Sequence, residues 1–110
     1  MANTFKLKTK ANVGVTTVGI YTAPAATTTV VIGITLSNTS GSGVNVGVAV
    51  SRTSTTQDDV NLLKNAPIPQ GSSLEFMGGN KVVLETNDQI NVNSDTNSSV
   101  DAALTIMEIT

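Results

Sequence analysis

Hydrophobic and polar residues alternate along much of the chain, and this alternation is the main guide to its secondary structure. Valine occupies every second position from Val44 to Val50, with small or polar residues between. A period of two is the pattern of a β-strand with one buried face. The same alternation runs from Val30 to Leu36, and residues 37–43 between the two runs have turn composition. The pattern predicts two strands joined as an antiparallel hairpin.

Two further pairs of short apolar runs predict two more hairpins, over residues 74–84 and 90–106. In the first pair, Met77-Gly78-Gly79-Asn80 supplies the turn. In the second pair, the polar stretch 94–99 separates the two runs. A short strand is also expected at 18–23, ended by Pro24.

The amino-terminal stretch, residues 1–15, alternates apolar residues with lysines. Apolar side chains share one parity at Phe5, Leu7, Val13 and Val15. Lysines share the other parity at Lys6, Lys8 and Lys10. We expect an edge strand that buries its apolar side and has a basic outer face, because lysines on an exposed edge discourage pairing with other sheets. The alternative is an interaction arm that adds to the sheet edge of a neighbour, with candidate contacts Phe5, Lys6, Leu7, Lys8 and Lys10.

The stretch from Asp58 to Gly71 is the hardest to assign. Residues 58–65 fit both helical and strand periods poorly, and a strand is favoured over a single helical turn. Pro67 and Pro69 cannot donate backbone hydrogen bonds, so residues 66–71 are expected to form a connecting loop or a sheet edge.

The predicted elements define an all-β fold of about eight or nine strands. Short strands at regular spacing, with Gly, Asn, Ser and Thr in the turns, indicate a two-sheet antiparallel β-sandwich of jelly-roll or Ig-like type. The 110 residues suit a single domain, 1–110. With aromatic residues at 3%, the core is expected to consist of Val, Ile and Leu.

The composition excludes most catalytic chemistry. The chain has no Cys and no His, so it lacks the thiol nucleophile, the soft metal ligands and the side chain that titrates near neutral pH. We therefore expect a protein that is not an enzyme, with no catalytic residues, no cofactor and no metal site.

Three groups of polar residues are candidate sites, and all three are interpreted as turns or loops. The carboxylates Asp58 and Asp59 are adjacent, so in a strand they would point to opposite faces, and Glu85 with Asp88 is interpreted as a solvated turn pair. The stretch Asn93-x-Asp95-x-Asn97 resembles half of a calcium loop. It lacks the glycine and the downstream Glu of such loops, so a polar hairpin loop is favoured.

The net charge and the hydropathy of the chain argue against two classes of partner, nucleic acid and membranes. The formal net charge of -2 provides no broad cationic field, so nucleic acid is not an expected partner. No apolar run is long enough to span a bilayer, and the first residues lack the apolar core of a signal peptide. We expect neither membrane association nor an export signal.

Several segments resemble small virion structural proteins of tailed bacteriophages. These segments are residues 20–25, 29–38, 63–74, 79–85, 88–90 and 106–110, for example Leu63-Lys64-Asn65-Ala66-Pro67-Ile68-Pro69-Gln70-Gly71. The resemblance runs from Ile20 to the carboxyl end and implies a head decoration or cement protein, or a neck, tail or fibre component, present in multiple copies. It implies as partners the protein itself and another virion protein such as the major capsid protein, in a virion assembled in the host cytoplasm.

A recognition module of the same architecture is the main alternative. Such a module would bind a host glycan or receptor through its Asn- and Ser-rich loops. Sugar-binding faces usually present exposed aromatic side chains, and Trp is 0 in this chain. Assembly is therefore favoured over glycan recognition.

Overall fold

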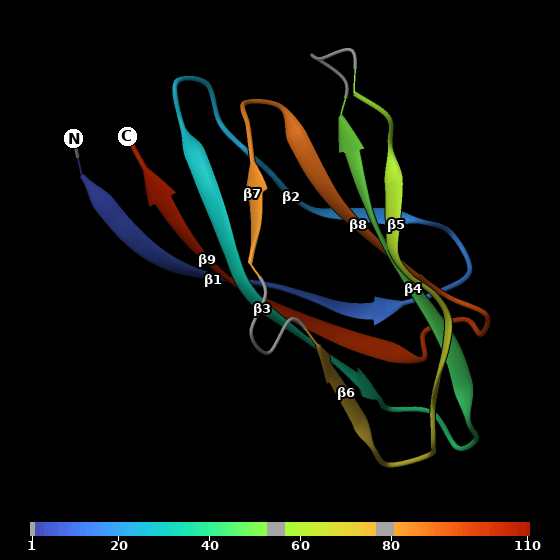
Figure 1. Ribbon diagram of the computed structural model, residues 1–110. Helices are drawn as coiled ribbons and strands as arrows, with labels where there is room; N and C mark the ends of the chain where they lie inside the picture. Colours follow the sequence, from blue (N-terminus) through green and yellow to red (C-terminus); the bar gives the residue numbers. More distant parts are fainter. Residues whose placement is uncertain (1, 53–56, 77–80) are drawn as a thin grey trace.

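The protein is an all-β sandwich, seen in a computed structural model that describes residues 2–52, 57–76 and 81–110 (Figure 1). A five-stranded sheet joins, in order, β1 (Asn3–Val13), β9 (Val100–Ile109), β3 (Thr28–Asn38) and β6 (Ser73–Phe76), with β7 (Val82–Leu84) also paired to β3. A four-stranded sheet joins β2 (Val18–Thr22), β8 (Asp88–Ser94), β4 (Val44–Arg52) and β5 (Val60–Ile68). Every pairing is antiparallel, and the predicted two-sheet sandwich is confirmed.

The strand order identifies the sandwich as a jelly roll, one of the two topologies that the sequence left open. The order β1-β9-β3-β6 in one sheet faces β2-β8-β4-β5 in the other, so the chain crosses between the sheets repeatedly. The first and last strands pair with each other, and both chain ends therefore lie together at one end of the molecule (Figure 1). The described residues contain no helix long and apolar enough to cross a bilayer.

The three predicted hairpins are wrong, although their strands lie close to the predicted positions. β3 and β4 belong to different sheets, and so do β8 and β9. β6 and β7 share a sheet, but both pair with β3; the predicted turn between them, 77–80, lies outside the described residues. Alternation shows which side chains are buried, and strands of both sheets bury theirs in the same core. The pattern is therefore identical for a hairpin and for a crossing between sheets.

The predictions for residues 58–71 and 18–23 agree with the structure better than the predicted hairpins do. β5 provides the strand favoured over a helical turn, and it continues through Pro67 to Ile68. Among the described strands it pairs with β4 alone, at the edge of the four-stranded sheet, where a proline without an N–H is tolerated. β2 occupies the short strand expected before Pro24.

The core lies between the two sheets and is aliphatic. Each sheet contributes alternate side chains that are almost fully buried, among them Ile34, Leu104, Ile106, Val46, Val48, Ile90 and Val92. Burying a side chain of this size contributes about 1.5 to 3 kcal/mol relative to leaving it exposed. The alternating aliphatic residues therefore hold the two sheets face to face.

Candidate interaction surface

β1, the strand with the candidate interface residues, forms one edge of the five-stranded sheet. Its only strand partner in the described chain is β9. The pairing runs without a break from Asn3 opposite Ile109 to Lys10 opposite Ala102. One side of β1 is therefore hydrogen-bonded, and the other side is a free sheet edge.

The hydrogen bonds at the chain ends show which backbone groups of β1 point to that free edge. The N–H of Ala2 donates to the carbonyl of Thr110 at 3.2 Å, and the N–H of Thr110 donates back to Ala2 at 3.0 Å. In an antiparallel pair, such doubly bonded positions alternate with positions whose backbone groups point away. The N–H and C=O groups of Phe5, Leu7 and Thr9 therefore face the free edge.

The predicted faces of β1 are reversed in the structure. Phe5 and Leu7, which we expected to be buried, are 69% and 63% exposed. The lysines, which we expected on the outer face, lie on the inner side because each is paired with a β9 residue whose side chain is buried: Lys6 with Ile106, Lys8 with Leu104 and Lys10 with Ala102. Phe5 and Leu7 consequently lie on the outer face of the sheet.

This reversal follows from the unequal lengths of strands in the two sheets. β1 has eleven residues, whereas β2, which contacts it from the opposite sheet, has five. From Asn3 to Asn12, no residue of β1 is fully buried, and Val13 is the first that is. The inner side of β1 is therefore open enough for a long lysine side chain to reach water, and the side chain of Lys6 is 42% exposed.

A polar cluster lies beneath β1 on the inner side of the sheet; we call Tyr21, Thr29, Glu108 and Lys6 the Tyr21 cluster. The Tyr21 hydroxyl donates to Oε2 of Glu108 at 2.6 Å and lies 2.7 Å from Oγ1 of Thr29. Nζ of Lys6 is 2.8 Å from Oε1 of Glu108. The hydrogen bonds from Lys6 and then from Tyr21 lower the pKa of Glu108, whereas burial and the Glu108 contact raise the pKa of Tyr21 to about 12.

A second charged group, the Arg52 cluster, consists of Arg52, Glu85 and Asp88. Nε of Arg52 is 3.1 Å from Oδ2 of Asp88, and Nη2 is 2.5 Å from Oε1 of Glu85. Oδ2 of the fully buried Asp88 also accepts the N–H of Glu85 at 2.8 Å. The two carboxylates, first Asp88 and then Glu85, raise the pKa of the guanidinium. Asp88 is therefore not the solvated turn residue that we expected, and its charge is paired with arginine.

The other carboxylates considered in the sequence analysis are exposed or accept a backbone hydrogen bond. Oδ1 of Asp59 accepts the N–H of Arg52 at 2.6 Å, while Asp58 is exposed, and both precede β5. In the stretch that resembles half of a calcium loop, Oδ1 of Asp95 accepts the N–H of Asn45 at 3.1 Å. Within the described part of the chain, no group of three His, Cys, Asp or Glu side chains is arranged to hold a metal ion.

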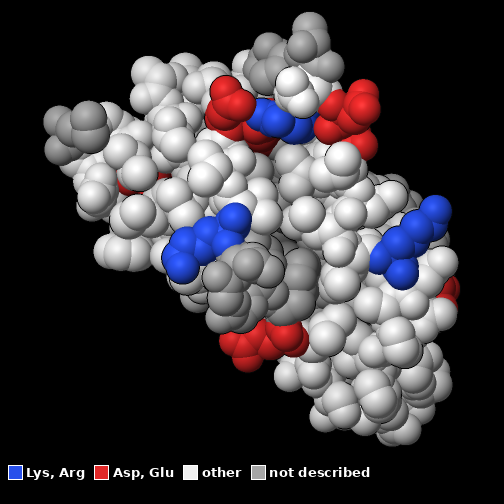
Figure 2. All heavy atoms as spheres, in the orientation of Figure 1, with Lys and Arg blue, Asp and Glu red and all other residues white. Residues whose placement is uncertain are grey.

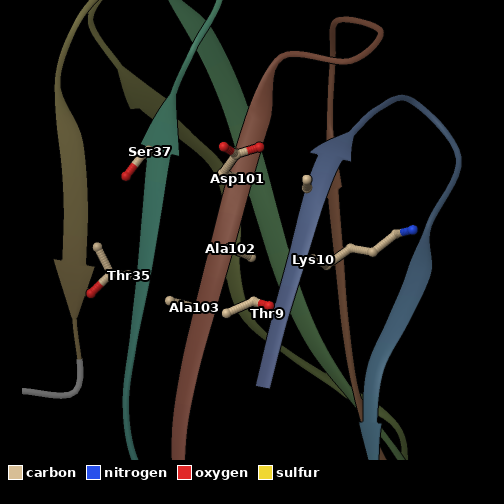
Figure 3. Close-up of a pocket in the computed structure, with 8 residues that line it drawn as sticks. Thr9, Lys10, Thr35, Ser37, Asp101, Ala102 and Ala103 are labelled. Carbon is tan, nitrogen blue, oxygen red and sulfur yellow. The ribbon is translucent and has the colours of Figure 1, made fainter. Parts of the chain in front are cut away.

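The outer face of the five-stranded sheet has a shallow hollow over β9. Its volume is about 260 Å³, and β1, β9 and β3 provide its lining (Figure 3). The lining residues are Thr9, Lys10, Ala11, Thr35, Ser37, Asp101, Ala102 and Ala103. On the molecular face in Figure 2, charged side chains form small groups of both signs separated by uncharged surface.

Sequence reasoning missed the Tyr21 cluster, although one signal for it was present. Glu108 continues the buried parity of Val100, Leu104 and Ile106 in β9, so a carboxylate stands where the pattern requires an apolar residue. A charge at a buried strand position requires a partner. The alternation in β1 offers Lys6 on the paired strand as that partner.

Comparisons with known proteins bear on the fold alone. No family model matches the chain, and no curated protein matches it. A similar solved structure is described as "Bacillus endospore appendages form a novel family of disulfide-linked pili". It aligns with a TM-score of 0.58 at 13% sequence identity, covering 99% of this chain and 87% of the other. The likeness shows that the sandwich architecture recurs in that structure.

Proposed function

We propose that this protein is a structural subunit that assembles with copies of itself through repeated noncovalent contacts. The observation that carries the proposal is the free edge of β1, where the backbone groups of three alternate residues, Phe5, Leu7 and Thr9, have no strand partner among the described residues. An unpaired edge strand is a template for pairing with another chain. Native sheets usually protect such an edge, and here it is eleven residues long.

The side chains of β1 support contact with a protein partner. Phe5 and Leu7 expose apolar surface beside the free backbone groups. Lys8 and Lys10 form no ion pair within the described residues, and they are available to acidic side chains of a neighbour, whereas Lys6 is held by Glu108. Strand addition would supply the affinity, and the lysines would select the partner edge.

The setting that we propose is the virion of a tailed bacteriophage, with the protein as a decoration or cement subunit on the capsid. The sequence resemblance to small virion proteins supports this setting, and the major capsid protein would be the second partner. A filament subunit is the second candidate, because the solved structure of similar fold is described as a pilus. That pilus is disulfide-linked, and this chain has no Cys, so its contacts would be noncovalent.

Replacement of Thr9 by proline tests strand addition directly. Thr9→Pro removes an N–H that faces the free edge and leaves the hydrogen bonds to β9 in place, whereas Thr9→Ala keeps the N–H. We expect the proline variant to lose the large assemblies that wild type and Thr9→Ala form, as measured by sedimentation velocity and negative-stain electron microscopy. Equal assembly of all three proteins would rule out this edge, and a monomeric wild type at its highest soluble concentration would rule out self-assembly.

The proposed location of the protein on the phage capsid requires a separate experiment. Gold-labelled antibody against the protein should decorate the heads of intact phage particles in electron micrographs. Labelling along filaments would favour the second candidate. Saturable binding of the isolated domain to sugars on a glycan array, without self-assembly, would favour the recognition module instead.

A further inference from the structure

A row of large apolar side chains crosses the outer face of the five-stranded sheet. In the strand register, Phe5 lies opposite Met107, Met107 opposite Val30, and Val30 opposite Val83. Phe5 and Val83 at the ends of the row are 69% and 56% exposed, and the two central residues are half-buried. This apolar row spans the sheet from the β1 edge to the β7 edge and has no cover in the described molecule.

A row of small side chains crosses the same face four residues before Met107 in β9. It contains Thr9, Ala103 and Thr35, which line the hollow of about 260 Å³ (Figure 3). Midway between the two rows, Thr105 of β9 lies opposite Gly33 of β3 and opposite Leu7 of β1, which is 63% exposed. At about 3.3 Å per residue, the apolar row and the hollow lie about 7 Å to either side of Thr105. The face thus has an apolar row and a hollow at equal distances from the row of Thr105.

We propose that this outer face stacks on the same face of a second copy, related by a two-fold axis that runs across the strands at Thr105. The proposal rests on the proposed self-assembly and names a second surface for it. Rotation about this axis places the Phe5 and Met107 row of each copy over the hollow at Ala103 of the other. The contact is isologous, because the same surface of each copy provides both the apolar row and the hollow.

The charges on the face favour this orientation. Among the described outward-facing residues of the five paired strands, the carboxylates are Glu75 and Asp101, and both lie at the hollow end. The two-fold axis moves them to opposite ends of the dimer. Stacking with the strands of the two copies in the same orientation would bring equal charges together, which destabilises an interface.

The size of the face also suits a second copy. Eleven residues at about 3.3 Å and four strands at about 4.8 Å give a face of about 36 by 19 Å, or roughly 700 Å². A standard interface buries about 800 Å² on each partner. Phe and Met are among the residues enriched in such interfaces, and this face presents both.

Gly33 offers a direct test. A Cβ at Gly33 would meet no atom within 4 Å, so Gly33→Gln should fold normally while it places a bulky, uncharged side chain at the centre of the proposed contact. Gly41→Gln is the matched control, because a Cβ at Gly41 also meets nothing within 4 Å but lies in the loop between β3 and β4. We expect Gly33→Gln to weaken the dimer at least about tenfold in sedimentation equilibrium, and Gly41→Gln to leave it unchanged. Equal dimerisation of both variants, with unchanged circular dichroism, would overturn face stacking.

Cross-linking provides a second measurement in a chain without native cysteine. Thr105→Cys places a thiol on the proposed axis, and a short bis-maleimide should cross-link the two copies across the roughly 10 Å between stacked sheets, whereas exposed Thr22→Cys in β2 should not be cross-linked. Assembly that fails with Thr9→Pro but is insensitive to Gly33→Gln would overturn the stacked face and leave the edge contact intact. A dimer that survives Thr9→Pro and is lost with Gly33→Gln would support the stacked face and rule out the edge.

Discussion

The two buried charged clusters of this sandwich are neutralised in different ways. In the Tyr21 cluster, the carboxylate of Glu108 is shared between a tyrosine hydroxyl at 2.6 Å and an ammonium group at 2.8 Å. In the Arg52 cluster, the charge of the fully buried Asp88 is balanced by one guanidinium, and its Oδ1 atom is buried without a hydrogen-bond partner among the described residues.

The Arg52 cluster depends on a full opposite charge more than the Tyr21 cluster does. Tyr21 and Lys6 bind different oxygens of Glu108, so loss of one contact leaves the other. Asp88 has already lost its hydration and one hydrogen bond, so its buried charge depends on Arg52 and on the N–H of Glu85. A buried charge that loses its partner is costly, whereas loss of one hydrogen bond costs less.

The largest expected effect comes from Asp88→Asn. This change keeps the size of the side chain but removes the charge that Arg52 faces, and it places an amide in a fully buried position. We expect the free energy of unfolding, measured by urea titration, to fall by about 3 kcal/mol.

The double variant Arg52→Met with Asp88→Asn separates charge pairing from packing. It should recover part of the loss, because the guanidinium, which in Asp88→Asn has lost one of its two carboxylate partners, is gone. A loss in Asp88→Asn as small as that from an exposed substitution would show that Asp88 does not depend on the ion pair.

The second expected effect is an alkaline transition read from Tyr21. Tyr21 is the single tyrosine of a chain without tryptophan, so absorbance of the phenolate reports this residue alone. Burial and the contact with Glu108 raise its pKa from 10.0 to about 12. We expect the absorbance to titrate near pH 12 in the folded protein and near pH 10 in urea.

The same pKa shift predicts how stability depends on pH. A group whose pKa is raised on folding stabilises the protein fully below its unfolded pKa, near 10, and loses that contribution as pH rises to about 12. Two pKa units correspond to about 3 kcal/mol. The stability difference between wild type and Tyr21→Phe should therefore shrink across this range, and a difference that stays constant would contradict the role of the hydroxyl.

The strands and the buried faces of the inner strands were predictable from alternation alone. Val44, Val46, Val48 and Val50 are all at most 4% exposed, as the pattern requires. The connections were not predictable, because parity is the same whether the next strand lies beside a strand or across the core from it. Strand order in a jelly roll depends on pairings such as β1 with β9, which local sequence does not encode.

The prediction of which face of β1 is buried was wrong for a different reason. Alternation shows that Phe5 and Leu7 share a face, but the face that becomes buried depends on whether the opposite sheet reaches it. β2 is too short to cover the inner side of β1, so lysines lie there, and Phe5 and Leu7 lie on the outer face, where they remain exposed. All five candidate interface residues lie on the edge strand that was predicted, but the outer face of this strand presents Phe5 and Leu7 where lysines were expected.

The smallest expected losses in the free energy of unfolding come from replacing the exposed members of the two clusters, Glu85 and Lys6. The Glu85 side chain is 65% exposed, and after Glu85→Gln the guanidinium of Arg52 retains Asp88, so we expect a loss of about 0.5 kcal/mol that decreases with added salt. Lys6→Gln removes a charged side chain that is 42% exposed, but the side chain of its partner Glu108 is only 8% exposed. We expect a larger loss of about 1 to 2 kcal/mol that depends less on salt, because a buried carboxylate keeps one hydrogen bond instead of two. Urea titrations of both variants at low and high salt measure the difference, and equal losses would show that burial of the partner does not govern these pairs.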